Sequence, residues 1–129
     1  MLIGETAKCA GVNVETIRYY ERKGILPVPK ARTSGYREYT TETVALISFV
    51  KNAQNLGFTL KEIQELLAIK VDVTSDCGDI KSRAQKKIVE IEEKIVALQE
   101  MKESLGIITT QCSGKGPVSE CTILNALNR

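Results

Sequence analysis

Apolar residues recur with a helical period along one stretch in the second half of the chain. Residues 79–105 contain no Pro and no Gly, and their apolar positions follow one another in alternating steps of three and four, interrupted by Lys102. This spacing, at helix-forming composition, is typical of the seam of a coiled coil. We therefore predict a dimerisation helix over residues 79–106, about 40 Å long. Its seam would consist of Ala84, Ile88, Ile91, Ile95, Leu98 and Leu105.

The beginning of the chain predicts two shorter helices joined by a tight turn. The first spans residues 3–10 and ends at Gly11. The second follows Asn13, a favourable N-cap residue, and spans residues 14–23. Two such helices are typical of a helix-turn-helix, in which the second helix enters the major groove of DNA.

The segment after this pair predicts a hairpin. Pro27 and Pro29 prevent the second helix from continuing. Ser34 and Gly35 form a turn signal between two short segments that can pair with each other. A hairpin in this place would be the wing of a winged helix-turn-helix domain.

Two further helices complete the predicted N-terminal domain. One begins at residue 41 or 42 and ends at residue 56; the other spans residues 60–69 and is opened by a capping box, Thr59-x-x-Glu62. We thus expect a mainly α protein whose small sheet is the wing. Its parts would be a DNA-binding domain over 1–70, a linker over 71–78, the dimerisation helix over 79–106, and a metal-binding loop with a short helix over 107–129.

Charge and side-chain chemistry favour nucleic acid as a partner of the N-terminal domain. Residues 1–58 carry eight Lys and Arg against five Glu, whereas residues 59–129 carry ten against eleven acidic residues. Arg and Tyr, including Tyr20, Arg22 and Tyr39, gather on the predicted recognition helix and wing, and their N–H and O–H groups suit phosphate oxygens. A solvated face with buried tyrosines is the alternative for any single residue. The two elements together favour DNA contacts by Thr16, Arg18, Tyr19, Arg32, Tyr36 and Arg37.

The sequence argues against export, membrane insertion and enzymatic activity. The chain shows no secretory signal and no run of 18 apolar residues, so we expect a cytoplasmic protein with reduced cysteines and no membrane partner. It contains no His and no C-x-x-C motif, which disfavours a thiol redox enzyme. That enzyme, and a DNA-bending protein merely stabilised by zinc, remain as alternatives.

Three of the four cysteines flank the predicted long helix. Cys77 precedes it, whereas Cys112 and Cys121 follow it, so within one chain Cys77 cannot reach the other two thiols. A second copy of the helix, laid antiparallel, would bring Cys77 of one chain beside Cys112 and Cys121 of the other. One homodimer would then hold two clusters of three thiols. Cys9 lies between small residues of the first helix, and we predict that it is a packing residue.

The motifs together resemble those of a known family. The segments IGETAKCAGVNVETIRYYERKGIL, GYREY and LGFTLKEIQELL resemble the bacterial MerR-type transcriptional regulators, and the cysteine spacing resembles their mercury-responsive branch. The resemblance implies a homodimer with an antiparallel dimerisation helix, and DNA contacts from Arg18, Tyr19, Tyr36 and Arg37. It also implies promoter DNA and RNA polymerase as partners, repression without metal, and activation by DNA distortion when metal binds.

Three converging thiolates indicate a soft effector ion. We expect Hg(II) as the effector. The resemblance to the family's mercury sensors implies that three sulfur ligands satisfy this ion. Zn(II) would need a fourth ligand, from Asp76, Asp79, Glu120 or water. Cd(II) and Pb(II) remain competitors. Family members that respond to Cu(I) carry Ser where Cys77 stands, and those with an iron–sulfur cluster carry four cysteines in the tail, where this chain has two.

Overall fold

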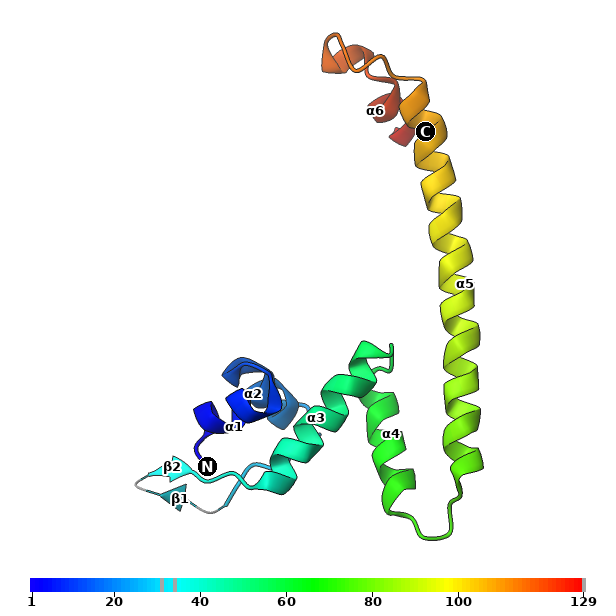
Figure 1. The fold of residues 1–129 in the computed structure, drawn as a ribbon. Coiled ribbons are helices and arrows are strands. Elements are labelled where there is room, and N and C mark those ends of the chain that lie inside the picture. Colours follow the sequence, from blue (N-terminus) through cyan, green and yellow to red (C-terminus); the bar gives the residue numbers. More distant parts are fainter. Residues whose placement is uncertain (31, 34, 129) are drawn as a thin grey trace. The chain divides into compact units, whose positions relative to one another are not determined.

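The computed structural model describes residues 1–30, 32–33 and 35–128, and of residues 32 and 33 only the backbone. The chain divides into two units, Met1–Arg83 and Ala84–Arg129. Helices make up most of each unit, and a single short hairpin lies in the first (Figure 1). The mainly α fold class is as predicted.

The first two helices have the predicted turn between them. Helix α1 spans Ile3–Ala10 and helix α2 spans Val14–Arg22. Gly11 has φ 70°, the left-handed conformation that ends a helix and that a Gly adopts without strain. The Asn13 side chain accepts a hydrogen bond from the Thr16 N–H at 2.8 Å and so caps α2. The predicted N-cap is confirmed.

The wing is a minimal antiparallel hairpin. Strand β1 (Arg32–Thr33) pairs with strand β2 (Tyr36–Arg37), so that Arg32 lies opposite Arg37. Gly35 has φ 82° in the connecting turn, a conformation that few other residues adopt. Ser34, the other residue of the predicted turn, lies outside the described residues.

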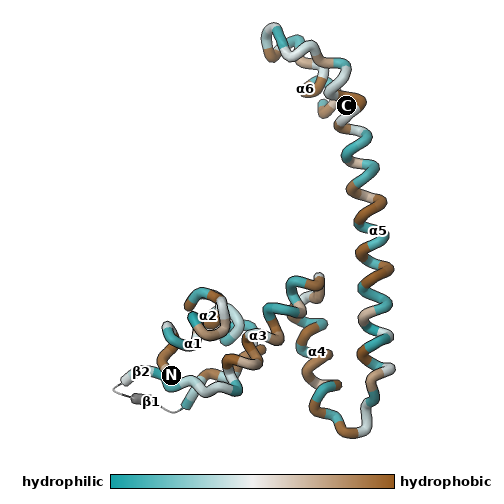
Figure 2. Tube along the Cα trace, in the orientation of Figure 1, coloured by the Kyte–Doolittle hydropathy of each residue, from teal (hydrophilic) through white to brown (hydrophobic). Residues whose placement is uncertain are grey.

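Helix α3 (Thr41–Asn55) packs against α1, and helix α4 (Leu60–Val71) packs against α3. The predicted capping box is present, because Glu62 N–H donates to Thr59 and the Glu62 side chain accepts from the Thr59 N–H. Helix α4 continues to Val71, two residues beyond the predicted end at Ile69. The apolar segments of the first unit are brown in Figure 2, and their buried side chains form one mainly aliphatic core, whose fully buried residues include Ile17, Leu26, Ile47, Val50 and Ile63.

Truncation of this core should destabilise the first unit, Met1–Arg83. Ile47 is 0% exposed, so we expect Ile47→Ala to lower the free energy of unfolding by about 2–5 kcal/mol, the usual cost of the lost contacts and the cavity. Urea denaturation followed by circular dichroism would measure this. Leu56→Ala is the control: Leu56 is 66% exposed, and the change should stay within about 0.5 kcal/mol. Equal effects of the two substitutions would contradict this account of the core.

The long helix extends beyond the predicted range at both ends. Helix α5 spans Cys77–Thr110, 34 residues or about 50 Å. Its start is fixed by Asp76, whose carboxylate accepts from the Gly78 N–H at 2.7 Å, while Asp79 accepts from the Asp76 N–H at 3.1 Å. Gly106 does not end the helix, because one Gly costs only about 1 kcal/mol in a helix interior. Cys77 is therefore a helical residue, and its placement in a linker was wrong.

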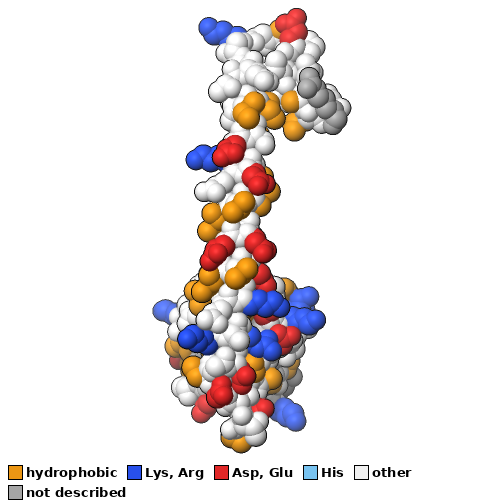
Figure 3. Space-filling model, turned by 90° about the vertical axis from the view of Figure 1, so that its right-hand side faces the viewer, with side chains coloured by type: hydrophobic (Ala, Val, Ile, Leu, Met, Phe, Trp, Pro, Cys, Tyr) orange, Lys and Arg blue, Asp and Glu red, His pale blue; other side chains and the backbone are white. Residues whose placement is uncertain are grey.

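The predicted seam of α5 is uncovered in a single chain. Apolar side chains follow the helix in Figure 3, and those of the seam are 38–61% exposed at Ile88, Ile91, Ile95, Leu98 and Leu105. After α5 the chain forms a loop, a 3-10 turn at Val118–Glu120 and helix α6 at Thr122–Leu127. Among the described helices, none combines the length and apolarity needed to cross a bilayer.

Candidate functional site

The exposed face of α2 carries the predicted DNA-contacting residues. The Arg18 side chain is 53% exposed and pairs with Glu15 of the same helix at 2.9 Å. An exposed pair of this kind is weak, so Arg18 can exchange Glu15 for another anion. Tyr19 is 39% exposed, and the Arg22 guanidinium lies 5.8 Å from its ring centroid. The Thr16 hydroxyl donates to Asn13 at 2.8 Å and therefore serves the helix cap.

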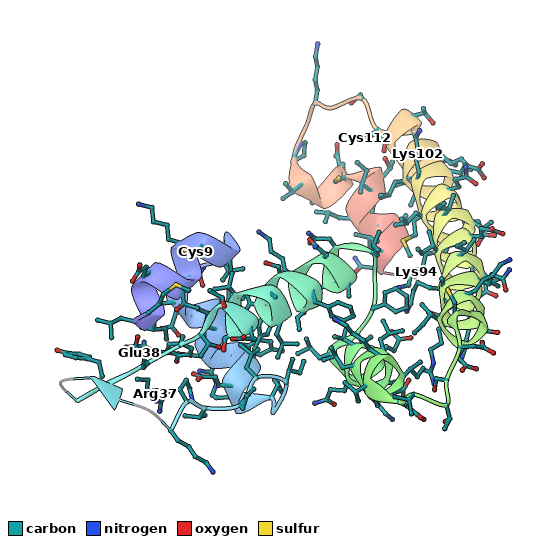
Figure 4. All side chains as sticks on the ribbon, turned by 60° about the horizontal axis from the view of Figure 1, so that its bottom comes forward. Cys9, Arg37, Glu38, Lys94, Lys102 and Cys112 are labelled. Atoms are coloured by element: carbon teal, nitrogen blue, oxygen red, sulfur yellow. The ribbon has the colours of Figure 1, made fainter. Side chains whose placement is uncertain are left out.

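The wing presents one exposed phenol and one anchored guanidinium. Tyr36 is 67% exposed. Arg37, labelled in Figure 4, is half-exposed, and its Nη1 donates to the Glu21 carboxylate at 3.3 Å. Arg32 lies in β1, but its side chain is outside what the structure describes. The wing therefore exposes Tyr36 and part of Arg37 to solvent, where the predicted DNA contacts would form.

Two tyrosines that the sequence grouped with the DNA-contacting residues are instead structural. Tyr20 is 2% exposed, and its hydroxyl donates to Gln54 of α3 at 2.6 Å. Tyr39 is also 2% exposed, and its hydroxyl donates to Glu21 at 3.1 Å. Burial raises the pKa of both phenols, so they stay neutral. Their predicted role in phosphate contact was wrong because the tertiary fold turns both rings inward.

Arginines of α2 and the wing surround shared surface pockets. One pocket of about 340 Å³ is lined by Arg18, Arg22 and Arg37, together with Glu21 and Val28. A second pocket of about 290 Å³ shares Arg18 and Arg37 and adds Tyr36. Guanidinium groups that converge on one pocket are well placed to bind a phosphate. The recognition helix and the wing thus form one basic surface.

Sequence reasoning missed Glu21. Its side chain is 5% exposed and contacts both Arg37 and Tyr39. A signal was present, because Glu21 follows Ile17 by one helical turn and therefore lies on the inner face of α2. A carboxylate on an inward face requires a partner, and here the wing supplies it.

In the second unit, the structure brings two cysteines to one loop. Cys112, labelled in Figure 4, and Cys121 are half-buried and line a pocket of about 350 Å³ after the end of α5. The Gly114 N–H points to the Cys112 sulfur at 3.4 Å. The Thr122 hydroxyl oxygen lies in the wall of the same pocket, buried and without a hydrogen-bond partner in the described part of the chain.

The environment of Cys121 favours its thiolate. The backbone N–H of Leu124 lowers the pKa of the Cys121 thiol, with smaller contributions from the Ile123 N–H and the Cys112 thiol, while burial opposes them. A thiolate is the form of cysteine that binds soft metal ions. Cys112 and Cys121 together therefore offer two sulfur ligands.

Cys77 is the first residue of α5 and is exposed. Among the described residues of one chain, no three Cys, Asp or Glu side chains come close enough to hold a metal ion. The three-cysteine site is thus not formed within a single chain, and it stays a prediction for the dimer. Cys9 is also exposed on α1 (Figure 4), so its predicted packing role was wrong; its neighbours Ala7 and Ala10 are the buried residues.

Comparison with known proteins places the chain in a family. Residues 1–69 match the family described as "MerR HTH family regulatory protein", and residues 44–106 match the one described as "MerR, DNA binding". The chain is 40% identical over 125 residues to the mercuric resistance operon regulatory protein of Bacillus cereus, covering 97% of this chain and 95% of that protein.

Two solved structures are similar over almost the whole chain. The dual function transcriptional regulator MerR of Bacillus megaterium MB1, in complex with mercury(II), is 37% identical, with a TM-score of 0.70 and complete coverage of both chains. The transcription regulator PbrR691 of Ralstonia metallidurans CH34, in complex with lead(II), is 29% identical, with a TM-score of 0.82 and 98% coverage of each chain. These matches confirm the predicted fold. The matched family consists of transcriptional regulators and not of enzymes, as predicted. The chain therefore belongs to the MerR family of DNA-binding, metal-responsive transcriptional regulators.

Proposed function

We propose that this protein is a mercury(II)-responsive regulator that represses a metal-resistance promoter without metal and activates it when Hg(II) binds. The observation that carries the proposal is the placement of three cysteines about α5. Cys77 is its first residue, Cys112 follows its last residue by two positions, and Cys121 lies beside Cys112. The regulator would act in the cytoplasm on promoter DNA together with RNA polymerase.

The proposed active form is an antiparallel homodimer. The exposed apolar seam of α5 needs a partner surface, and a second copy of the same helix supplies one. About 50 Å separates the two ends of a helix of 34 residues, so only an antiparallel partner brings the required sulfurs together. Cys77 of one protomer would then share an ion with Cys112 and Cys121 of the partner subunit.

The ligand set fits Hg(II) better than Zn(II). Three thiolates suit a soft divalent cation, whereas zinc sites in proteins are usually closed by a fourth ligand. The carboxylates nearest to Cys77 in the sequence are those of Asp76 and Asp79, and each already accepts a backbone N–H at the start of α5. Recruiting either one as a zinc ligand would weaken the helix cap. The relative from Bacillus cereus and the mercury(II) complex from Bacillus megaterium support the same choice.

Lead(II) is the second candidate effector. The lead(II) complex of PbrR691 matches the fold of this chain with a TM-score of 0.82. Lead is also thiophilic, and three sulfur ligands satisfy it. Cd(II) is a third ion of the same chemical class. The choice among these ions therefore depends on relative affinity.

The metal would act by favouring one conformation of the dimer. An ion can switch a protein only if it binds one conformation more tightly than the other. A bond between Cys77 and the tail of the partner subunit links the start of one α5 to the end of the other. We propose that this link changes the spacing of the two DNA-binding units and so distorts the promoter between their contacts.

A metal titration of the purified protein tests the proposal. Ultraviolet thiolate-to-metal absorption should saturate at two Hg(II) per dimer, with the spectrum of three-sulfur coordination. Competition with Pb(II), Cd(II) and Zn(II) would rank the ions. Saturation with a two-sulfur spectrum, or tighter binding of Zn(II) than of Hg(II), would contradict the proposed site.

The arginines shared by both pockets should control DNA affinity. Each charge-assisted contact to phosphate contributes about 1.5 kcal/mol, and a dimer makes each contact twice, so Arg18→Ala or Arg37→Ala should weaken DNA binding roughly 100-fold. The slope of log Kd against log salt concentration should also fall. Fluorescence anisotropy over a range of salt concentrations measures both quantities. Metal stoichiometry should not change, and wild-type DNA affinity would remove that arginine from the contact surface.

A further inference from the structure

We propose that Glu21 is a positioning residue for DNA recognition: its buried carboxylate holds the Arg37 guanidinium of the wing beside the recognition helix. The proposal rests on the part of the proposed function that assigns DNA contacts to α2 and the wing. It does not depend on which metal the protein senses.

The contacts of Glu21 show why its charge is retained in the interior. Its side chain is 5% exposed, and a buried carboxylate is unfavourable unless hydrogen bonds compensate for the loss of water. Arg37 Nη1 donates to Oε1 at 3.3 Å, and the Tyr39 hydroxyl donates to Oε2 at 3.1 Å. Both oxygens of a residue on the recognition helix are therefore used by residues of the wing segment.

The wing needs such support. Each strand has two residues, and an isolated hairpin of this size is not stable in water. The backbone two residues after β2 is fixed separately, because the Tyr39 N–H donates to the Met1 carbonyl at 2.6 Å. Loss of the Glu21 charge should therefore leave the wing backbone in place and release mainly the Arg37 side chain.

Arg37 can contact Glu21 and DNA at the same time. A guanidinium has five N–H donors, and the contact with Glu21 uses Nη1. The Arg37 side chain is 40% exposed and lines both pockets with Arg18. An arginine already held in its binding orientation loses less side-chain entropy when it contacts a phosphate. Glu15 has no such role, because its pair with Arg18 is exposed on both sides.

The two possible roles of Glu21, a repulsive charge or a positioning residue, predict opposite changes in DNA affinity for Glu21→Gln. A carboxylate near a phosphate site repels DNA, so charge alone predicts that Glu21→Gln strengthens binding. If Glu21 instead positions Arg37, the same substitution weakens binding. The sign of the change therefore separates the two roles.

The experiment measures Kd for the highest-affinity duplex that the wild-type protein selects from a random-sequence pool. We expect Glu21→Gln to bind about 10-fold more weakly and to show a shallower salt dependence. The matched control is Glu15→Gln, which removes one charge from the exposed face of the same helix and should not weaken binding. In an Arg37→Ala background, Glu21→Gln should change Kd less than twofold, because the side chain that it positions is absent.

Several results would overturn the proposal. These are unchanged or tighter binding by Glu21→Gln, an equal loss in Glu15→Gln, or the same loss with and without Arg37. If Arg37→Ala itself bound normally, the assignment of DNA contacts would fail instead, and the two failures are thus distinguishable. Should Glu21→Gln not fold, Tyr39→Phe removes one of the two donors while keeping the buried ring, and a loss that disappears without Arg37 is again expected.

Discussion

Cys77→Ser is expected to abolish activation by Hg(II) and to leave DNA binding without metal at the wild-type level. Cys112 and Cys121 lie together in one unit of one chain, so they can still hold Hg(II) through two sulfurs. That ion would no longer link the two protomers, because only Cys77 lies at the opposite end of α5. The coupling free energy between metal and DNA, typically about 1–3 kcal/mol for allosteric ligands, would be lost. Metal binding and metal response would thus separate in this variant.

The measurement compares Hg(II)-dependent transcription in vitro with the thiolate-to-metal absorption of the same protein. Cys112→Ser and Cys121→Ser should also lose the response, and they should bind Hg(II) more weakly than Cys77→Ser because the two-sulfur loop site is broken. Cys9→Ser is the control: Cys9 is exposed on α1, and the variant should respond normally. Activation that survived any one of the three ligand substitutions would contradict the three-thiolate site.

The helices of the DNA-binding unit could be predicted because their signals are local. Asn13 and Thr59 cap their helices as expected, since capping depends on residues three positions apart. The ends of α5 were harder. Asp76, just before Cys77, and Asp79, in the first turn, stabilise the start of the helix. Gly106 is tolerated within α5 because one Gly costs only about 1 kcal/mol in a helix interior.

Side-chain roles that depend on tertiary packing could not be predicted from the sequence. Helical spacing from Ile17 places Tyr20, but not Tyr19, on the inner face of α2. The partner of the Tyr20 hydroxyl, Gln54, lies 34 residues away, and no local pattern indicates it. Cys9 was misjudged for the same reason, since its neighbours take the inward positions of a short helix. The metal site depends on a further level, the association of two chains. The assignment of its three cysteines as metal ligands is therefore based on the sequence, on the length of α5 and on the family.

Disruption of the dimer interface should affect metal sensing and DNA binding at once. A single chain leaves Ile95 49% exposed, and in an antiparallel pair this residue would pack against the seam of its partner. Ile95→Asp would remove that packing, about 1.5–3 kcal/mol for each chain, and would bury a carboxylate without a partner. We expect the dimer dissociation constant to rise roughly 1,000-fold or more, as sedimentation equilibrium would measure.

The proposed metal site and the full set of DNA contacts both require two chains. Ile95→Asp should therefore remove metal sensing and DNA binding together. A monomer lacks the third sulfur, and it can contact only one half-site of a two-fold symmetric operator. Cysteine variants should lose the first function alone, and arginine variants the second. Val96→Asp is the matched control, since Val96 is 53% exposed but lies one position outside the seam, and it should remain dimeric. Dissociation of Val96→Asp, with Ile95→Asp still dimeric, would place the interface on another face of α5.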